Sequence, residues 1–83
     1  MQIKINKRLF TESMRYWRND LSGKPFLFDY IMAVWNKDSR RAYEFINAEP
    51  NIKQAVLDYL SQIAGTQPNP EILFILLSRL INP

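Results

Sequence analysis

The sequence contains no cysteine and no histidine, and only two of its 83 residues are glycine. Without cysteine the chain forms no disulfide and supports no thiolate chemistry. Without histidine it lacks the most frequent general base and the most frequent metal ligand of proteins. It also has neither a glycine-rich phosphate loop nor a cluster of metal ligands. We therefore expect no catalytic activity, no cofactor or metal, and no small-molecule substrate.

Long hydrophobic segments are also missing. The longest uninterrupted apolar run covers residues 72–77, far short of the roughly 20 residues that a membrane-spanning helix needs. Residues 1–10 alternate polar and apolar side chains, so they lack the apolar centre of a signal peptide. We expect a cytoplasmic protein that does not interact with membranes.

The length and composition predict one ordered domain. A chain of 83 residues, of which 47% are hydrophobic, is long enough for one domain and too short for two. We expect this domain to cover residues 1–83, with residues 1–5 as an N-terminal arm. The arm alternates like a short strand, but no second strand-like segment follows to pair with it. Strand addition to a partner is the alternative for this arm.

Hydrophobic residues recur three and four positions apart in five segments, which is the pattern of amphipathic helices. Asp38 or Ser39 is suited to cap the third helix, and Asn51 with Gln54 resembles a capping box at the fourth. The sequence therefore predicts an all-α bundle of five short helices. These cover residues 6–21, 25–36, 38–48, 50–64 and 69–81.

The last predicted helix, residues 69–81, is apolar around most of its circumference. At about 100° per residue, only Glu71 and Ser78, with Asn82 beyond them, share a narrow polar stripe. A helix of this kind has to be surrounded, so we expect it to be the central spine of the bundle. Residues 25–36 form a second helix of this type, and a small bundle has room to enclose one. The apolar surface that the bundle cannot enclose predicts a binding surface for a partner or a second copy. The alternative is that the two helices bury each other.

Positive charge is concentrated in the first half of the chain. Residues 1–41 hold nine basic and four acidic side chains, whereas residues 42–83 hold two basic and four acidic ones. We expect a basic face that binds an acidic protein surface or, alternatively, nucleic acid, with residues 38–48 as the recognition helix of a helix-turn-helix-like unit. Ordinary solvated charge is the third interpretation. The candidate basic face consists of Lys7, Arg8, Arg15, Arg18, Arg40 and Arg41.

Three aromatic residues are candidate anchors for a protein partner: Tyr16, Trp17 and Trp35. Tryptophan and tyrosine are enriched at binding hot spots, although burial in the core is the alternative for all three. Arg79 is a lone cation within the apolar arc of the last helix. It either extends its charged end to the surface or pairs with a carboxylate, such as Glu71 of a second copy.

Together these observations predict a small, non-catalytic, regulatory binding protein of the adaptor, inhibitor or immunity type. It would act through protein–protein contacts, with a homodimer as a further expectation. The alternative is a nucleic-acid-binding protein that uses its basic N-terminal half.

Overall fold

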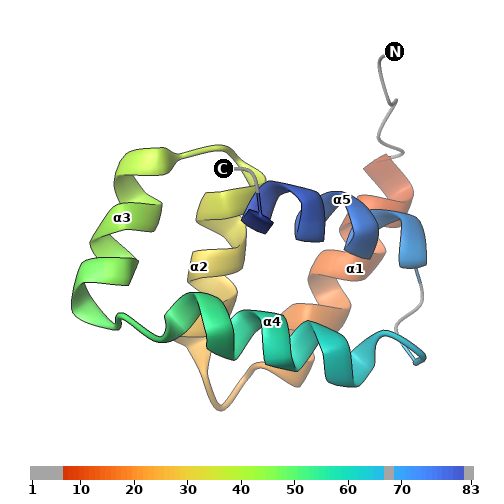
Figure 1. The fold of residues 1–83 in the computed structure, drawn as a ribbon. Helices are drawn as coiled ribbons and strands as arrows, with labels where there is room; N and C mark the ends of the chain where they lie inside the picture. Colours follow the sequence, from red (N-terminus) through yellow and green to blue (C-terminus); the bar gives the residue numbers. More distant parts are fainter. Residues whose placement is uncertain (1–6, 67–68, 82–83) are drawn as a thin grey trace.

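Five α-helices make up most of residues 7–66 and 69–81, the part of the chain that the computed structural model describes (Figure 1). No strand occurs within these residues, which confirms the predicted all-α bundle. The predicted N-terminal arm, residues 1–5, lies outside the described residues. The helices are α1 (Lys7–Asp20), α2 (Pro25–Trp35), α3 (Ser39–Ala48), α4 (Ile52–Ile63) and α5 (Pro70–Ile81).

The starts of α3 and α4 are stabilised in different ways. Asp38 caps α3 as predicted, because its side chain accepts a hydrogen bond from the backbone N–H of Arg41 at 3.2 Å. The predicted capping box at α4 is wrong, since the Asn51 side chain makes no cap hydrogen bond. Gln54 instead donates from Nε2 to Oδ1 of Asp58 at 2.9 Å. Side chains four residues apart on a helix are neighbours, and this one offers a charged acceptor.

The turn between α2 and α3 holds Lys37 in the left-handed backbone conformation, with φ of 56°. Its N–H donates to the carbonyl of Val34, and the N–H of Asp38 donates to the carbonyl of Ala33, at 3.1 and 2.9 Å. These bonds satisfy carbonyls at the end of α2 in the manner of a left-handed C-terminal cap. Glycine adopts this conformation freely, whereas other residues pay about 1 kcal/mol or more. The turn therefore keeps a lysine where the backbone favours a glycine.

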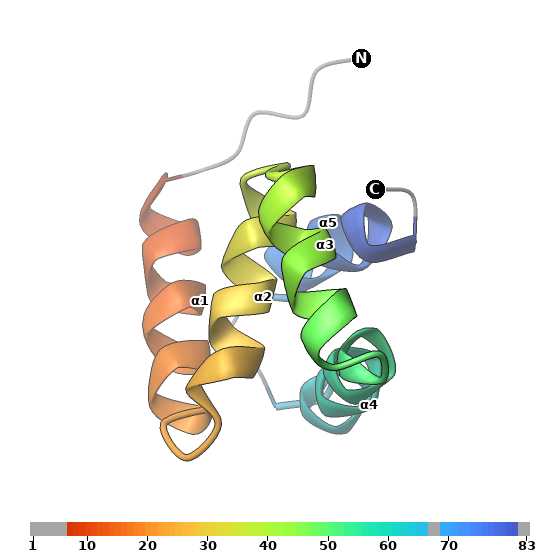
Figure 2. The same cartoon turned by 90° about the vertical axis from the view of Figure 1, so that its left-hand side faces the viewer.

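The helices form two layers. In Figure 1, α1, α2 and α3 run alternately down, up and down, and α4 and α5 cross them. Figure 2, turned by 90°, shows that α4 and α5 both lie on the same side of this three-helix layer. Within the described residues, the backbone of α2 packs closely on all four other helices, whereas the backbones of α3 and α5 do not approach each other closely. A gap over α2 therefore separates α3 from α5.

The central position belongs to α2, and this corrects the prediction that the C-terminal helix is the spine. Six of the eleven residues of α2 are buried. By contrast, α5 contacts α1, α2 and α4 only, and it leaves Phe74 and Ile81 with 70% and 63% of their surface exposed. The bundle encloses one of its two apolar helices, as we expected for a bundle of this size. The enclosed helix is α2, whereas the sequence predicted α5.

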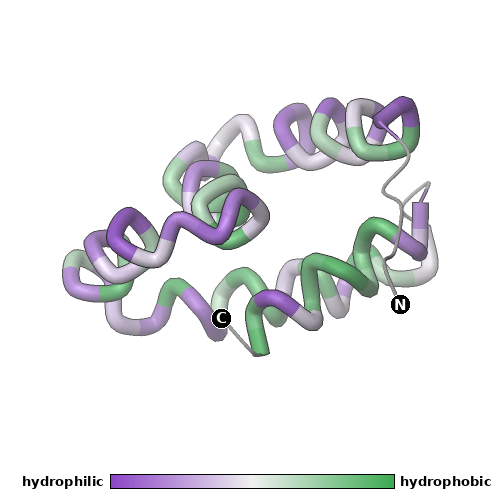
Figure 3. The backbone as a smooth tube through the Cα atoms, turned by 90° about the horizontal axis from the view of Figure 1, so that it is seen from above, coloured by the Kyte–Doolittle hydropathy of each residue, from purple (hydrophilic) through white to green (hydrophobic). Residues whose placement is uncertain are grey.

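The hydrophobic core is one cluster of buried side chains from α1, α2, α4 and α5 together with Leu21. None of the residues of α3 is buried; this helix packs through the partly buried Ala42, Phe45 and Ile46. In Figure 3, the helix that leads to the C-terminus is coloured as hydrophobic along most of its length. No helix in residues 7–66 and 69–81 combines the length and hydrophobicity needed to cross a membrane.

Hydrogen bonds from Asn69 and Tyr59 join elements that lie far apart in the sequence. Asn69, directly before α5, donates from Nδ2 to the carbonyl of Leu9 and to Oγ of the fully buried Ser13, both at 3.1 Å. The hydroxyl of Tyr59 in α4 donates to Oδ2 of Asp20, the last residue of α1, at 2.7 Å. Together these bonds orient both helices of the second layer against α1.

Candidate functional site

Two adjoining clefts, of about 300 and 290 Å³, open where α3 and α5 stand apart above α2. They share the side chains of Val34, Ser39, Ala42 and Arg79, so we treat them as one surface and call it the α3–α5 cleft. The cleft lies where α3 and α5 both pack on α2 while their backbones stay apart from each other.

The α3–α5 cleft has an apolar floor and a basic rim. Hydrophobic side chains line it from α2, α3 and α5. Three cations also line it, each from a different element: Lys37 from the turn after α2, Lys53 from α4, and Arg79 from α5. The lining contains one carboxylate, Asp38, which already caps α3. The apolar lining consists of Tyr30, Ala33, Val34, Ala42, Tyr43, Ile46 and Leu80.

The guanidinium group of Arg79 is held by Trp35. Its Cζ lies 4.6 Å from the centroid of the Trp35 ring, which is a cation–π contact. Its Nη1 also donates to the backbone carbonyl of Trp35 at 2.5 Å. No carboxylate of the described residues pairs with Arg79. Arg79 is half-buried and lines the cleft, which agrees with the expectation that its charged end reaches the surface; its pairing with Glu71 of a second copy stays a prediction.

Tyr30 and Tyr43 contribute to the cleft in different ways. Tyr30 is almost fully buried and packs edge-to-face on Phe45 of α3, with 6.1 Å between ring centroids. Burial raises the pKa of Tyr30, because a phenolate would lose its hydration. Tyr43 is 64% exposed and stands at the rim. One tyrosine therefore fixes α3 on α2, and the other presents its ring to solvent.

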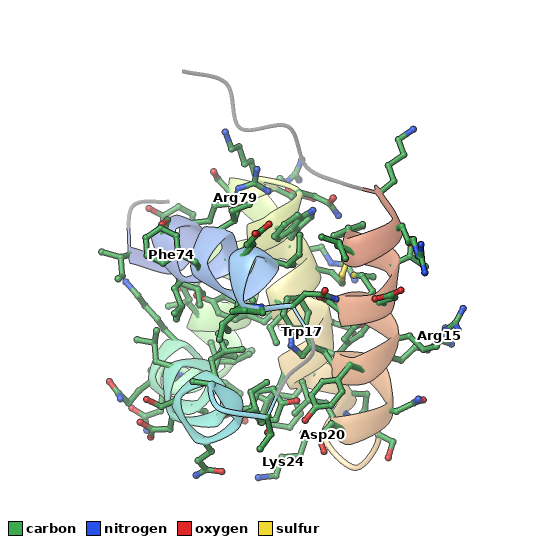
Figure 4. The ribbon with its side chains drawn as sticks, turned by 90° about the vertical axis from the view of Figure 1, so that its right-hand side faces the viewer. Arg15, Trp17, Asp20, Lys24, Phe74 and Arg79 are labelled. Carbon is green, nitrogen blue, oxygen red and sulfur yellow. The ribbon has the colours of Figure 1, made fainter. Side chains whose placement is uncertain are left out.

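The six cations of the predicted basic face are exposed, but the fold divides them into two groups. Lys7, Arg8, Arg15 and Arg18 lie on α1, and Arg40 and Arg41 begin α3, which α1 does not contact. Figure 4 shows Arg15 directed away from the bundle. The predicted face is therefore two separate patches on either side of α2.

Ion pairs and a ring contact engage three of these six cations. Arg8 pairs with Glu12 at 3.4 Å and Arg40 with Glu44 at 4.0 Å. The guanidinium of Arg41 lies 5.8 Å from the ring centroid of Phe45. All these contacts are solvent-exposed and local, so each stabilises the fold little.

Two of the three predicted aromatic anchors belong to the core, which corrects their assignment to a partner surface. Trp17 is fully buried between α1 and the rest of the bundle (Figure 4), and its Nε1 has no hydrogen-bond partner in the described part of the chain. Trp35 is 7% exposed and stacks on Phe10 with 4.7 Å between ring centroids. Tyr16 is partly buried and packs against the core cluster. None of these rings lines the cleft.

Sequence reasoning missed Lys37 and Lys53 as members of a site. Both occur in a turn or on the polar side of a helix, where lysine is common, so nothing in their neighbourhood marks them. Their common location depends on the gap between α3 and α5, which no local pattern encodes. Arg79 was noticed because it interrupts an apolar arc, and that signal did identify a member of the cleft.

In residues 7–66 and 69–81, no group of three or more potential metal ligands lies together. The chain matches no protein-family model, and comparisons with curated proteins and with solved structures give no significant match. The chemistry of the α3–α5 cleft is therefore the basis for the proposal that follows.

Proposed function

We propose that this chain is a small, non-catalytic binding protein of the adaptor, inhibitor or immunity type, and that the α3–α5 cleft is its contact surface for a protein partner. One observation carries the proposal: an apolar floor opens to solvent beneath three cations, none of which pairs with a carboxylate of the described residues. Exposed apolar surface bounded by polar groups is typical of protein interaction sites.

The open shape of the cleft favours a protein partner over a small molecule. Sites for small molecules have volumes of roughly 300–1,000 Å³ and enclose most of the ligand. The two halves of the α3–α5 cleft together have a volume within that range, but both halves are open to solvent and would leave much of a small ligand uncovered. An open cleft of this size suits a few side chains that project from a larger surface.

Affinity purification with variants of the cleft tests this proposal. We would immobilise the chain, incubate it with lysate of the cells that express it, and compare retained proteins by mass spectrometry. Ala42→Arg places a long side chain in both halves of the cleft, and Tyr43→Ala removes the exposed ring at its rim. Lys24→Glu changes an exposed charge in the turn between α1 and α2 as the matched control. A partner retained by the wild type and the control, but not by the cleft variants, supports the proposal; equal retention by all variants would contradict it.

A second candidate function is nucleic-acid binding, which the exposed cations of α1 favour. Lys7, Arg15 and Arg18 are exposed and make no ion pair within the described residues. Such cations bind phosphates with an affinity that falls as salt rises. The separation of α1 from α3 means that the six cations do not form one continuous face. A retardation assay at two salt concentrations tests this function: the Arg15→Glu, Arg18→Glu double variant should lose binding, and no binding by the wild type at low salt would exclude it.

A further inference from the structure

We propose that the α3–α5 cleft recognises an acidic, hydrophobic protein segment. In this assignment a large apolar side chain of the partner packs on the cleft floor, and a neighbouring aspartate or glutamate pairs with Arg79. The inference rests on the proposed function, because it specifies the chemistry of the partner that occupies the same cleft.

The floor of the cleft supplies the hydrophobic part of this recognition. Its accessible apolar surface comes from α3, through the partly buried Ala42 and Ile46 and the exposed Tyr43, while Val34 and Leu80 lie almost fully buried beneath them. α3 contributes no fully buried residue, so its inward face retains solvent-accessible apolar atoms. Covering such atoms stabilises a complex by roughly 25 cal/mol per Å² of apolar surface removed from water.

The positive charges around the cleft supply the part of this recognition that selects acidic residues in the partner. Lys37 lines one half of the cleft, Lys53 lines the other half, and Arg79 lines both. The one acid in the lining, Asp38, is engaged by the backbone N–H of Arg41. The lining therefore carries three positive charges and one negative charge, which leaves an excess of positive charge. A partner that brings carboxylates neutralises it, whereas a basic or neutral partner leaves it uncompensated.

Arg79 is the cation best suited to take a carboxylate. A guanidinium carries five N–H donors, and Nη1 already donates to the carbonyl of Trp35. The Trp35 ring, stacked on Phe10, holds the group in one place. A donor that is ordered before binding loses less entropy when it pairs. Because Arg79 is half-buried, a pair formed there is screened by water less than one on the open surface.

A phosphate backbone fits this cleft less well than an acidic peptide. A row of phosphates would satisfy the three cations, but it offers no apolar group for Ala42, Tyr43 and Ile46. An acidic segment with a leucine or aromatic side chain satisfies both parts of the lining. The test must therefore distinguish binding of nucleic acid from binding of an acidic peptide.

Selection from a library of random displayed peptides tests the inference on the full-length chain. We expect enrichment of Asp or Glu next to Leu, Phe or Trp. The selected peptide, made synthetically with a fluorescent label, would then be titrated with each variant by fluorescence anisotropy. Arg79→Met should weaken binding by about tenfold or more, and Lys53→Glu by several-fold. Lys24→Glu is the matched control, since Lys24 is exposed and lies at the opposite end of the molecule from Arg79 in Figure 4.

A double-variant comparison identifies the carboxylate–Arg79 pair. Replacing the acidic residue of the peptide by its amide should weaken binding to the wild type by about tenfold, but should have little further effect on Arg79→Met. If Arg79→Met does not fold, as judged by circular dichroism, Lys53→Glu and Lys37→Gln decide the question on their own. Equal binding of the acidic and amide peptides by the wild type would overturn the inference.

The remaining outcomes separate this inference from the proposed function. Peptides that lack enriched acids, but lose binding to Ala42→Arg, would overturn the acidic-segment inference and leave the cleft as a protein-binding surface. Failure to enrich any peptide, or binding that Ala42→Arg does not affect, would overturn both. A single-stranded oligonucleotide that binds with dependence on Arg79, in the absence of acidic peptide enrichment, would assign the cleft to nucleic acid and overturn both as well.

Discussion

Arg79 contacts Trp35 twice, through the indole ring at 4.6 Å and through the backbone carbonyl. Trp35 is the last residue of α2, and Arg79 lies in the last turn of α5. The two contacts therefore attach the C-terminal end of α5 to the C-terminal end of the central helix. This attachment forms one wall of the α3–α5 cleft, so fold stability and binding share the same side chain.

Replacing Arg79 tests the contribution of this attachment to stability. Arg79→Met keeps the apolar stem but loses the cation–π contact and the hydrogen bond, so we expect the free energy of unfolding to fall by about 1–2 kcal/mol. Arg79→Lys should lose less, because the charge can still lie over the ring. Urea denaturation measures both, and Arg18→Met, at an exposed site on α1, should change stability by less than about 0.5 kcal/mol. Equal effects of Arg79→Met and Arg18→Met would show that the attachment does not stabilise the fold.

Lys37 should show a trade-off between stability and binding. Its φ of 56° is unfavourable for a residue with a side chain, and the same side chain lines the cleft. Lys37→Gly relieves the backbone strain but makes the unfolded chain more flexible, so we expect a net gain of up to about 1 kcal/mol. Removal of the cation should at the same time weaken binding of the acidic peptide. Lys37→Asn, which tolerates the left-handed conformation, is the control. Loss of stability in Lys37→Gly would contradict the strain argument.

The helices could be predicted from the sequence because their signals are local. Hydrophobic spacing located every helix to within two residues of its observed ends, and the cap at Asp38 was read from residue type and position. The centre of the bundle could not be assigned in this way. Both α2 and α5 are apolar on most sides, and only their packing shows that α2 is enclosed while Phe74 on α5 is exposed.

The same dependence on packing explains why the sequence did not predict all the site residues correctly. Trp17 lies on the apolar side of α1, where a core residue and a binding anchor have identical spacing, and only its complete burial separates the two. The lysines of the cleft gave no local signal, because Lys37 and Lys53 line its two halves only through the way that α3 and α5 pack on α2. Positions that depend on contacts between distant helices therefore require coordinates.

The Tyr59–Asp20 contact predicts how stability depends on pH. Burial, and then the hydrogen bond and negative charge of Asp20, raise the pKa of Tyr59 in the folded state. The unfolded tyrosine loses its proton near its ordinary pKa of about 10, while the folded one retains it. Above that pH the unfolded state binds fewer protons than the folded state, so stability falls as pH rises further. Below about pH 10 the contribution of this group is fully present.

Tyr59→Phe isolates this effect. At neutral pH the variant loses the hydrogen bond to Asp20, and we expect its free energy of unfolding to fall by about 1 kcal/mol. In urea denaturation between pH 7 and 11, the decline above pH 10 should be shallower than in the wild type. Asp20→Asn keeps an acceptor without the charge and should lie between the two. A variant whose stability declines as steeply as that of the wild type would rule out Tyr59 as a source of the alkaline loss.

The outer face of α5 predicts weak self-association. Phe74 and Ile81 lie seven residues apart, and therefore on one side of the helix, with 70% and 63% of their surface exposed. Two copies that pair along this stripe would cover four such side chains. Two short helices bury less area than a standard interface, so we expect a dissociation constant weaker than about 10 µM. Sedimentation velocity over a range of concentrations should show a dimer that Phe74→Glu abolishes.

Phe26→Glu is the matched control for this dimer, because Phe26 is also an exposed phenylalanine (44%) but lies at the start of α2. If both variants reduce association equally, the contact is non-specific hydrophobic attraction and not pairing along α5. If the wild type stays monomeric at millimolar concentration, the stripe is not a self-association surface. In either case peptide binding by the α3–α5 cleft should persist in Phe74→Glu, since Phe74 does not line the cleft. Loss of both activities in this one variant would mean that the dimer builds the cleft, and that the two surfaces act as one.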